Sequence, residues 1–246
     1  MRGQTLTKKE LVQVGGRPII WHVMQIFSSY GLKRFILTLG YEAEQIRRYF
    51  MENEGLVQDP EAESGAPSGS LSVSFLDDVG NEPWQITMVD TGLHTMKASR
   101  ISRVKEHLHG DRFFVAYGDD VSSVNLTELR AFHMNHGKMA TLTSVQINLE
   151  YGVIDADDKG LVTGFIERPR LYQWINGGFF LFERGVLDLI PPDRDVNLEK
   201  EVLVQLAEMG ELMAFKYTGF WQSMNTMKDN ILLEELWRNG APWKSW

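Results

Sequence analysis

The N-terminal part of the chain alternates between helical and strand-like hydrophobic patterns, and this alternation restricts the possible folds most strongly. Residues 18–30 carry a wide apolar stripe behind Pro18, a residue that suits the first turn of a helix. Residues 35–41 form a short apolar run typical of a buried strand, and residues 42–53 follow as an amphipathic helix. Helices that alternate with strands predict an α/β fold with a mixed, mainly parallel sheet.

Later segments continue the alternation and then change in character. Residues 113–118 and 140–145 are apolar and predict two further strands. Between them, Asn125 suits the N-cap of a helix that Gly137 can end. The stretch from about 150 to 220 contains short strand-like pieces joined by tight turns, which predict a small accessory β region.

The length of the chain favours one domain. Its 246 residues suffice for a single large core, and we find no internal repeat, so we expect one domain over residues 1–246. Residues 226–239 predict a C-terminal helix, and the Gly-, Pro- and Ser-rich residues 54–70 predict a loop.

Composition excludes several classes of protein. The chain has no cysteine, which excludes disulfides, thiolate zinc sites and cysteine nucleophiles and is consistent with a reducing cytoplasm. A net charge of −8 argues against a general nucleic-acid surface, which needs a basic face. The first residues lack the apolar core of a signal peptide, and no apolar run approaches the roughly 18 residues of a membrane span. We therefore expect a cytoplasmic protein that binds neither membranes nor nucleic acid.

An acidic pair follows one of the predicted strands. Asp119 and Asp120 come directly after the strand that ends at Tyr117 and Gly118. In parallel α/β sheets, ligands bind outside the carboxyl ends of the strands. Carboxylate oxygens suit Mg²⁺, which usually shares its coordination sphere with phosphate. The pair therefore predicts a magnesium site, with a solvated turn or a helix cap as the alternative.

Cations gather before the first predicted helix. Lys8, Lys9 and Arg17 accompany the Gly15-Gly16 turn, a combination that suits a phosphate group near a helix start. The alternative is a basic N-terminal segment without fixed structure.

Two polar groups lie in the accessory region. Glu167 and Arg168 could bind a sugar hydroxyl and a phosphate respectively, because a guanidinium binds two oxygens at once. The alternative is a surface ion pair before a proline turn. Asn176, Gly177 and Gly178 precede a strand, where paired glycines let the backbone approach a ligand closely. The alternative there is a bulge or a tight turn.

Segments along nearly the whole chain together resemble the glucose-1-phosphate cytidylyltransferases, a branch of the sugar-phosphate nucleotidyltransferases. The most specific of them are INGGFF (175–180), GELMAF (210–215) followed by FWQ, and APWK (241–244). The resemblance implies a Rossmann-like nucleotidyltransferase core, a Mg²⁺ cofactor and often a homo-oligomer. The implied substrates are CTP and α-D-glucose 1-phosphate, which give CDP-glucose and pyrophosphate.

The resemblance also implies roles for individual residues. Asp119 matches a metal-binding aspartate of the family, and Asn225 falls on the second metal position. Lys9 matches a lysine that contacts phosphates, and Glu167 with Arg168 matches a Glu-Lys pair that holds the sugar phosphate. Lys9, Asp119 and Arg168 are therefore the expected catalytic residues. The expected substrate-binding residues are Thr91, Gly92, Arg100, Tyr117, Gly152, Glu167, Arg168, Asn176 and Gly177.

The chain departs from the family pattern in four places. The family begins with a strand and a glycine-rich loop ending in Gly-Thr-Arg, whereas this sequence begins MRG, so we expect that loop and a central piece of the sheet to be absent. Asn225 replaces an aspartate, and Asp120, where the family has glycine, could restore the lost charge. Residues 97–100 (KASR) replace Thr-Gly-Gly-Arg, and KKE replaces Pro-Lys-Pro around Lys9.

Two other functions stay open at this point. The departures at the N-terminus and at Asn225 are compatible with a catalytically impaired homologue that acts as a sugar-nucleotide-binding or partner subunit. An acidic pair after a strand, Asp119-Asp120, also suits a nucleotide-sugar-dependent glycosyltransferase, although the INGGFF and FWQ segments argue against that class.

Overall fold

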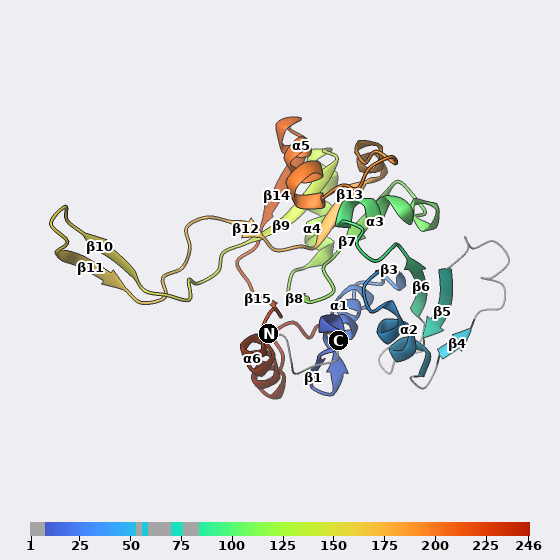
Figure 1. Ribbon diagram of the computed structural model, residues 1–246, viewed down its shortest axis with the longest axis horizontal. Helices are drawn as coiled ribbons and strands as arrows, with labels where there is room; N and C mark the ends of the chain where they lie inside the picture. Colours follow the sequence, from blue (N-terminus) through green and yellow to red (C-terminus); the bar gives the residue numbers. More distant parts are fainter. Residues whose placement is uncertain (1–7, 53–55, 59–69, 76–83) are drawn as a thin grey trace.

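The structure, a computed structural model, describes residues 8–52, 56–58, 70–75 and 84–246. These residues form an α/β body from which a long hairpin projects (Figure 1). Most of the loop expected at residues 54–70 lies outside the described residues.

The helices that the structure describes are α1 (Ile19–Ser28), α2 (Ala43–Glu52), α3 (Lys97–Arg103), α4 (Leu126–His136), α5 (Leu203–Glu208) and α6 (Met227–Arg238), with the short turns η1 (Lys9–Leu11), η3 (Lys105–His107), η4 (Arg184–Leu189) and η5 (Leu198–Val202). The strands are β1 (Gln13–Val14), β2 (Arg17–Pro18), β3 (Arg34–Leu39), β4 (Leu56–Gln58), β5 (Ser70–Phe75), β6 (Trp84–Asp90), β7 (Arg112–Val115), β8 (Asp120–Ser122), β9 (Ala140–Val145), β10 (Val153–Ala156), β11 (Val162–Ile166), β12 (Ile175–Asn176), β13 (Phe180–Glu183), β14 (Leu212–Lys216) and β15 (Trp221–Ser223).

The strands form two main sheets. One has the order β12-β9-β13-β7 with β14 beside β9, and the other has the order β3-β6-β5-β4. The predicted mixed α/β fold is confirmed, but the expectation of a mainly parallel sheet is wrong for the described strands. Among them, β3 pairs with β6 and β9 pairs with β14 in parallel, whereas the other ladders are antiparallel. The physical reason is that β13 re-enters the sheet between β7 and β9 in the opposite direction to both.

A cavity of about 820 Å³ separates the two sheets. Residues of β3, β7 and α1 line it. Within the part of the chain that the structure describes, β3 pairs with β6, whereas β7 pairs with β13. There, no ladder joins β3 to β7.

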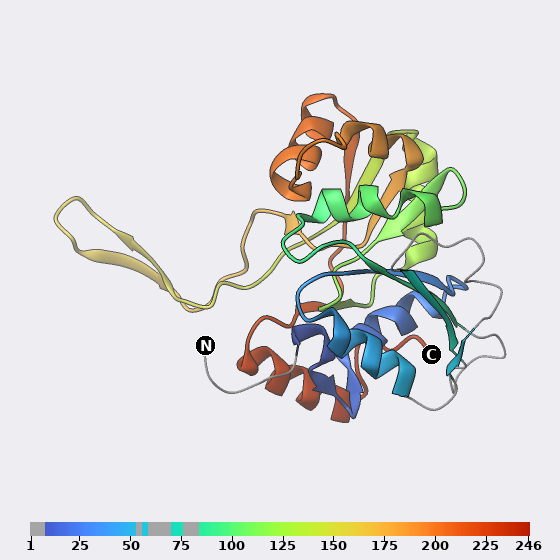
Figure 2. The same ribbon diagram turned by 45° about the vertical axis from the view of Figure 1, so that its right-hand side comes forward.

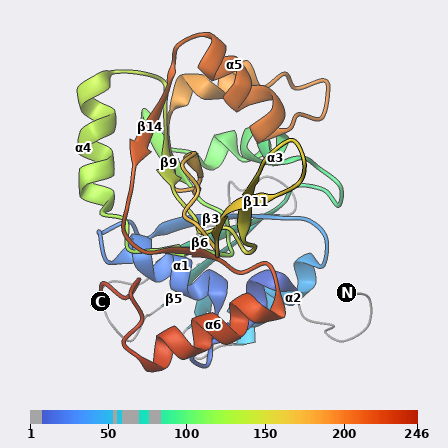
Figure 3. The same cartoon turned by 90° about the vertical axis from the view of Figure 1, so that its left-hand side faces the viewer.

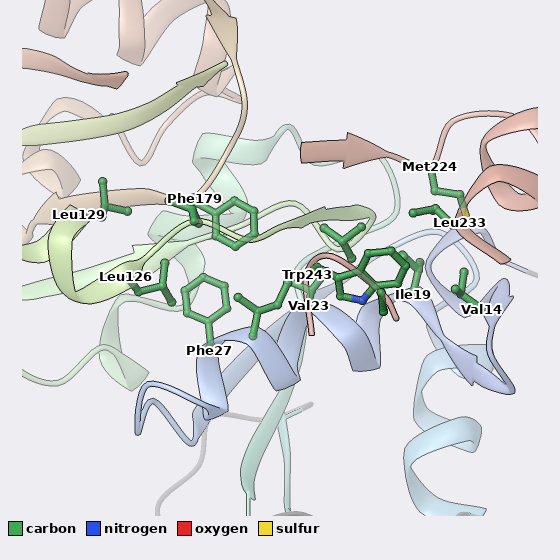
Figure 4. Close-up of a cluster of buried hydrophobic side chains, with 14 residues drawn as sticks. Val14, Ile19, Val23, Phe27, Leu126, Leu129, Phe179, Met224, Leu233 and Trp243 are labelled. Carbon is green, nitrogen blue, oxygen red and sulfur yellow. The ribbon is translucent and has the colours of Figure 1, made fainter. Parts of the chain in front are cut away.

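Helix α1 is buried on all sides. Pro18 precedes it in extended conformation, and Gly31 lies just beyond it with a φ of +80°. Val23 and Phe27 pack against a core cluster that joins α1, α4, α6 and the C-terminal Trp243 (Figure 4). On the other side, Ile20, Trp21 and Met24 pack against α2 and β6. The helix therefore links the N-terminal sheet to the C-terminal segments.

His22 holds the C-terminus against α1. Its side chain is fully buried, and its ring contacts the rings of Trp21, Trp237 and Trp243 edge-on. The Nε2 atom lies 2.8 Å from the carbonyl oxygen of Val14, and Trp243 donates to Nδ1 at 3.3 Å. Burial lowers the pKa of His22 to about 4, so the ring is neutral at pH 7.

The projecting hairpin consists of β10 and β11, and we call residues 151–172 the arm. It extends away from the body in Figures 1 and 2, and Figure 3 views it end-on. The other strands of the segment expected as accessory, β12, β13 and β14, belong to the sheet with β7 and β9. Large apolar side chains on the arm are exposed, namely Tyr151, Val153, Ile154, Leu161, Val162, Phe165, Ile166 and Tyr172.

Candidate active site

Three predicted residues from distant parts of the chain meet beyond the end of β7. Asp119 lies between β7 and β8, and β8 pairs with β15 so that Asp120 stands opposite Ser223. The amide of Met224 donates to the carbonyl oxygen of Asp119 at 2.9 Å, which brings Asn225 beside the acidic pair. Lys9, from η1, forms an ion pair with Asp119 and donates to Oδ1 of Asn225 at 2.6 Å.

The second carboxylate of the acidic pair is buried. Asp120 is 4% exposed, and burial raises its pKa to about 6 although a hydrogen bond with Ser223 opposes the shift. Repulsion from Asp119 raises the pKa further, whereas Lys9 lowers it. The two carboxylates therefore have different environments. Asp120 is buried, whereas the Asp119 side chain is about one-fifth exposed and open to an incoming ligand.

The site provides some, but not all, of the ligands that a divalent ion needs. The carboxylate of Asp119 and the amide oxygen of Asn225 converge on a single ammonium group, that of Lys9, so both oxygens point to one cation position. Oxygen ligands are those that Mg²⁺ prefers. Among the described residues, no group of three or more His, Cys, Asp or Glu side chains could hold a metal. Further ligands would have to come from water or from a phosphate.

Tyr117 joins two other elements to this region. Its hydroxyl donates to Glu199 at 2.8 Å and accepts from Nδ2 of Asn176 at 3.0 Å. Lys97 forms an ion pair with Glu199 and lies 4.4 Å from the centre of the Tyr117 ring. Burial, with the hydrogen bond to Glu199, raises the pKa of Tyr117 well above its ordinary value, so the hydroxyl stays a donor. Glu199 could not be predicted from the sequence, because no local pattern links it to Lys97.

Thr91 and Arg100 lie beyond the carboxyl ends of β3 and β6. The guanidinium of Arg100 donates to the Thr91 hydroxyl at 2.6 Å and to the carbonyl oxygen of Leu39 at 2.8 Å. Gly92 has a φ of +91°, and its amide donates to Asp90 at 2.9 Å. Thr91 is buried and its hydroxyl donates to the Leu39 carbonyl oxygen at 2.7 Å, so both side chains hold the backbone in place here.

The arm carries three expected site residues away from Asp119. Glu167 and Arg168 form an exposed ion pair with an oxygen–nitrogen distance of 3.5 Å. Gly152 lies against Glu167 and the Phe165 ring, because a Cβ atom there would approach the Glu167 carboxylate to 2.9 Å. Arg168 has a φ of +48°, which turns the chain after β11. Within one chain, the structure therefore shows the surface ion pair that the sequence left open as the alternative.

Asn176 and Gly177 mark an interruption between β12 and β13. Gly177 approaches the Val145 side chain so closely that a Cβ atom would lie 3.0 Å from it. The Asn176 side chain accepts from the amide of Gly178, and Trp221 donates to the Gly177 carbonyl at 2.8 Å. The close approach at Gly177 is thus to the neighbouring strand β9, while the Asn176 side chain faces Tyr117.

Comparison with known proteins identifies the class to which this fold and site belong. Residues 4–234 match the family model of the nucleotidyl transferases. The chain belongs to this family, and the enzyme class predicted from the sequence is confirmed.

Individual relatives narrow the class. The chain is 39% identical over 247 aligned positions to glucose-1-phosphate cytidylyltransferase of Salmonella typhi, covering 99% of this chain and 93% of the relative. It is 30% identical to mannose-1-phosphate guanylyltransferase catalytic subunit beta of Drosophila melanogaster, covering 91% of this chain and 55% of that protein. The crystal structure of HddC from Yersinia pseudotuberculosis shares the fold with a TM-score of 0.68 at 17% identity, over 96% of this chain and 92% of that one.

These comparisons confirm the resemblance found in the sequence, and the Rossmann-like nucleotidyltransferase fold is confirmed with it. Of the helices that the structure describes, none combines the length and apolarity that crossing a membrane requires.

Proposed function

We propose that this chain transfers a cytidylyl group from CTP to α-D-glucose 1-phosphate, giving CDP-glucose and pyrophosphate. The observation that carries the proposal is the convergence of Lys9, Asp119 and Asn225 beyond β7. The 39% identity to a glucose-1-phosphate cytidylyltransferase over 99% of the chain supports the choice of base and sugar. The same family match favours nucleotidyl transfer over sugar transfer to an acceptor.

The reaction is an in-line displacement. An oxygen of the sugar phosphate attacks the α-phosphorus of CTP, and the bond from that phosphorus to the bridging oxygen of the β-phosphate breaks, releasing pyrophosphate. Bound Mg²⁺ would neutralise the negative charge on the phosphates, and Asp119 with Asn225 would hold it. Lys9 would contact phosphate oxygens that gain charge in the transition state. Tyr117 and Asn176 would position the sugar through their linked polar groups.

The remaining expected residues fall into two groups. Thr91, Gly92 and Arg100 would bind the nucleotide beyond β3 and β6. Gly152, Glu167 and Arg168 would bind the sugar phosphate, but in one chain the arm holds them apart from Asp119. We propose a homo-oligomer for this reason, and the exposed apolar side chains of the arm support it. A lone two-stranded hairpin is marginally stable in water, so the arm needs a surface to pack on.

The purified chain tests this function directly. It is incubated with glucose 1-phosphate, Mg²⁺ and each of the four common ribonucleoside triphosphates in turn, and pyrophosphate release is measured. We expect release with CTP in clear excess over the other three. Release with a different nucleotide would correct the base, and absence of release with all four nucleotides would contradict the proposal. We also propose a cytoplasmic location, because a chain without cysteine is consistent with a reducing compartment.

Two observations favour a second function. Asn225 at the second metal position removes a negative charge, and the cavity between β3 and β7 leaves the core incompletely filled. Both features suit a catalytically impaired homologue that binds sugar nucleotides. Calorimetry with CDP-glucose distinguishes the two, because binding without any pyrophosphate release would favour this second function.

A further inference from the structure

The ammonium group of Lys9 occupies the point on which the two expected metal ligands converge. It forms an ion pair with Oδ2 of Asp119 and donates to Oδ1 of Asn225 at 2.6 Å. The Nδ2 atom of Asn225 in turn donates to the Ser223 hydroxyl at 2.9 Å, which fixes the amide with its oxygen toward Lys9. Asn225 therefore directs its Oδ1 atom to the position of the Lys9 ammonium, and an oxygen is also the atom that a metal ion at this position would need.

Lys9 already supplies a positive charge to these two ligands, beside the buried carboxylate of Asp120. Asp119 contributes one negative charge, and Asn225 contributes a neutral oxygen. One ammonium group balances this pair of ligands, whereas a divalent ion added to the same point would face the Lys9 charge at close range. Like charges at such distances repel strongly, even in surroundings that water reaches. A metal ion therefore binds well here after Lys9 has moved away.

Lys9 is able to move because of how it is held. Its side chain is 39% exposed, so the ammonium can swing into solvent or toward a phosphate group. The neighbouring Lys8 anchors the backbone, because its amide donates to Gln45 and its ammonium donates to the Tyr41 carbonyl oxygen, both at 2.8 Å. The backbone can thus stay fixed while the Lys9 side chain changes partner.

We propose that Lys9 is an internal counter-cation that competes with the divalent metal for the oxygens of Asp119 and Asn225. The proposal rests on the proposed function in one respect, since the triphosphate is the acceptor toward which the displaced ammonium turns. Metal and nucleotide then favour each other's binding. The nucleotide draws the Lys9 ammonium away from the metal position, and the metal releases that ammonium to contact the triphosphate. In the absence of nucleotide, Lys9 keeps the affinity for a divalent ion low.

The test measures binding of Mn²⁺ alone, through the electron paramagnetic resonance signal of the free ion, with no nucleotide or sugar present. Lys9→Met removes the competing charge and nearly keeps the side-chain length. We expect it to bind Mn²⁺ about tenfold more tightly than the unaltered chain, as removal of a unit charge close to a divalent ion implies. Lys9→Arg keeps the charge and should stay within about twofold of the unaltered chain.

Lys138→Met is the matched control, because it removes a similarly exposed lysine that forms an ion pair with Glu211 instead of the acidic site. It should leave Mn²⁺ affinity unchanged, and circular dichroism with thermal melts confirms that each variant is folded. Equal or weaker Mn²⁺ binding by folded Lys9→Met would overturn the proposal, as would equal tightening by Lys138→Met. A chain that shows this tightening but releases no pyrophosphate would keep the inference and refute the proposed function.

Discussion

The hydroxyl of Tyr117 donates to Glu199 at 2.8 Å, although 82 residues separate the two in sequence. This bond ties the segment just ahead of Asp119 to the turn η5. Because Asn176 donates to the same hydroxyl, a single tyrosine joins three separate parts of the chain beside the acidic pair. Its position makes Tyr117 the first residue to test.

Replacing Tyr117 by Phe should destabilise the protein. The change removes the acceptor of the Asn176 amide group and one of the two donors to Glu199, which keeps Lys97. An unsatisfied half-buried polar group costs about 1–3 kcal/mol in free energy of unfolding. Urea unfolding followed by circular dichroism measures the change. Tyr30→Phe is the matched control, because the Tyr30 hydroxyl makes a long 3.4 Å contact with the Val124 carbonyl and should lose less. Equal losses in the two variants would contradict the role assigned to Tyr117.

Replacing Asp119 by Asn should abolish most of the activity without unfolding the protein. The substitution removes the charged oxygen that Lys9 and the expected metal share, so we expect pyrophosphate release to fall by at least about 100-fold. The thermal midpoint should change little, because the side chain is partly exposed. Asp193→Asn removes an exposed aspartate elsewhere and should retain full activity. Near-normal turnover by Asp119→Asn would exclude Asp119 from the reaction.

Acid should destabilise the contact between α1 and the C-terminus through His22. The pKa of His22 is about 4 in the folded protein against an ordinary 6.5, so the unfolded chain binds the proton more tightly. The free energy of unfolding contributed by this group therefore falls as pH drops from about 6.5 toward 4, by up to about 3 kcal/mol.

His22→Gln isolates this effect, because glutamine does not titrate there. The raised pKa of Asp120 has the opposite effect, because it increases the free energy of unfolding as pH drops over a similar range. Both proteins contain Asp120, so its effect cancels in the comparison. Urea unfolding from pH 7 to 4 should show a shallower loss of stability for His22→Gln than for the unaltered chain. Parallel pH profiles would show that His22 does not titrate as its burial implies.

Polar substitutions on the arm should weaken the proposed self-association. Leu161 and Phe165 are 67% and 63% exposed, and burial against a second copy would stabilise the assembly through their apolar area. Leu161→Ser with Phe165→Ser should shift the mass measured by light scattering toward the monomer. Met209→Ser changes an exposed apolar residue outside the arm and should leave the mass unaltered. A monomeric unaltered chain would rule out the homo-oligomer.

Local sequence patterns predicted the individual elements well. Asn125 caps α4 by accepting from the amides of Thr127 and Glu128, and Gly137 ends the helix in left-handed conformation. Helix α1 lies within the predicted range 18–30, and strand β3 overlaps the predicted range 35–41, with ends that differ by one or two residues. These features depend on neighbours within a few residues, so periodicity and capping chemistry suffice to predict them.

Sheet direction was harder to predict. The sequence indicated strands at 113–118 and 140–145, but it gave no sign that β13 inserts between them in the opposite direction. Strand pairing depends on contacts between segments far apart in the chain, and each strand's own pattern is compatible with either direction. The Tyr117–Glu199 bond escaped prediction for the same reason.

By itself, the sequence determined the family, the α/β class and the place of Asp119 after a buried strand, because all of these follow from short motifs and local periodicity. Tertiary structure alone decided that Lys9 meets Asn225 across 216 residues and that the arm carries Glu167 and Arg168 away from Asp119 within one chain. Those outcomes depend on how strands pair and how the arm leaves the sheet, and no local pattern encodes such long-range geometry.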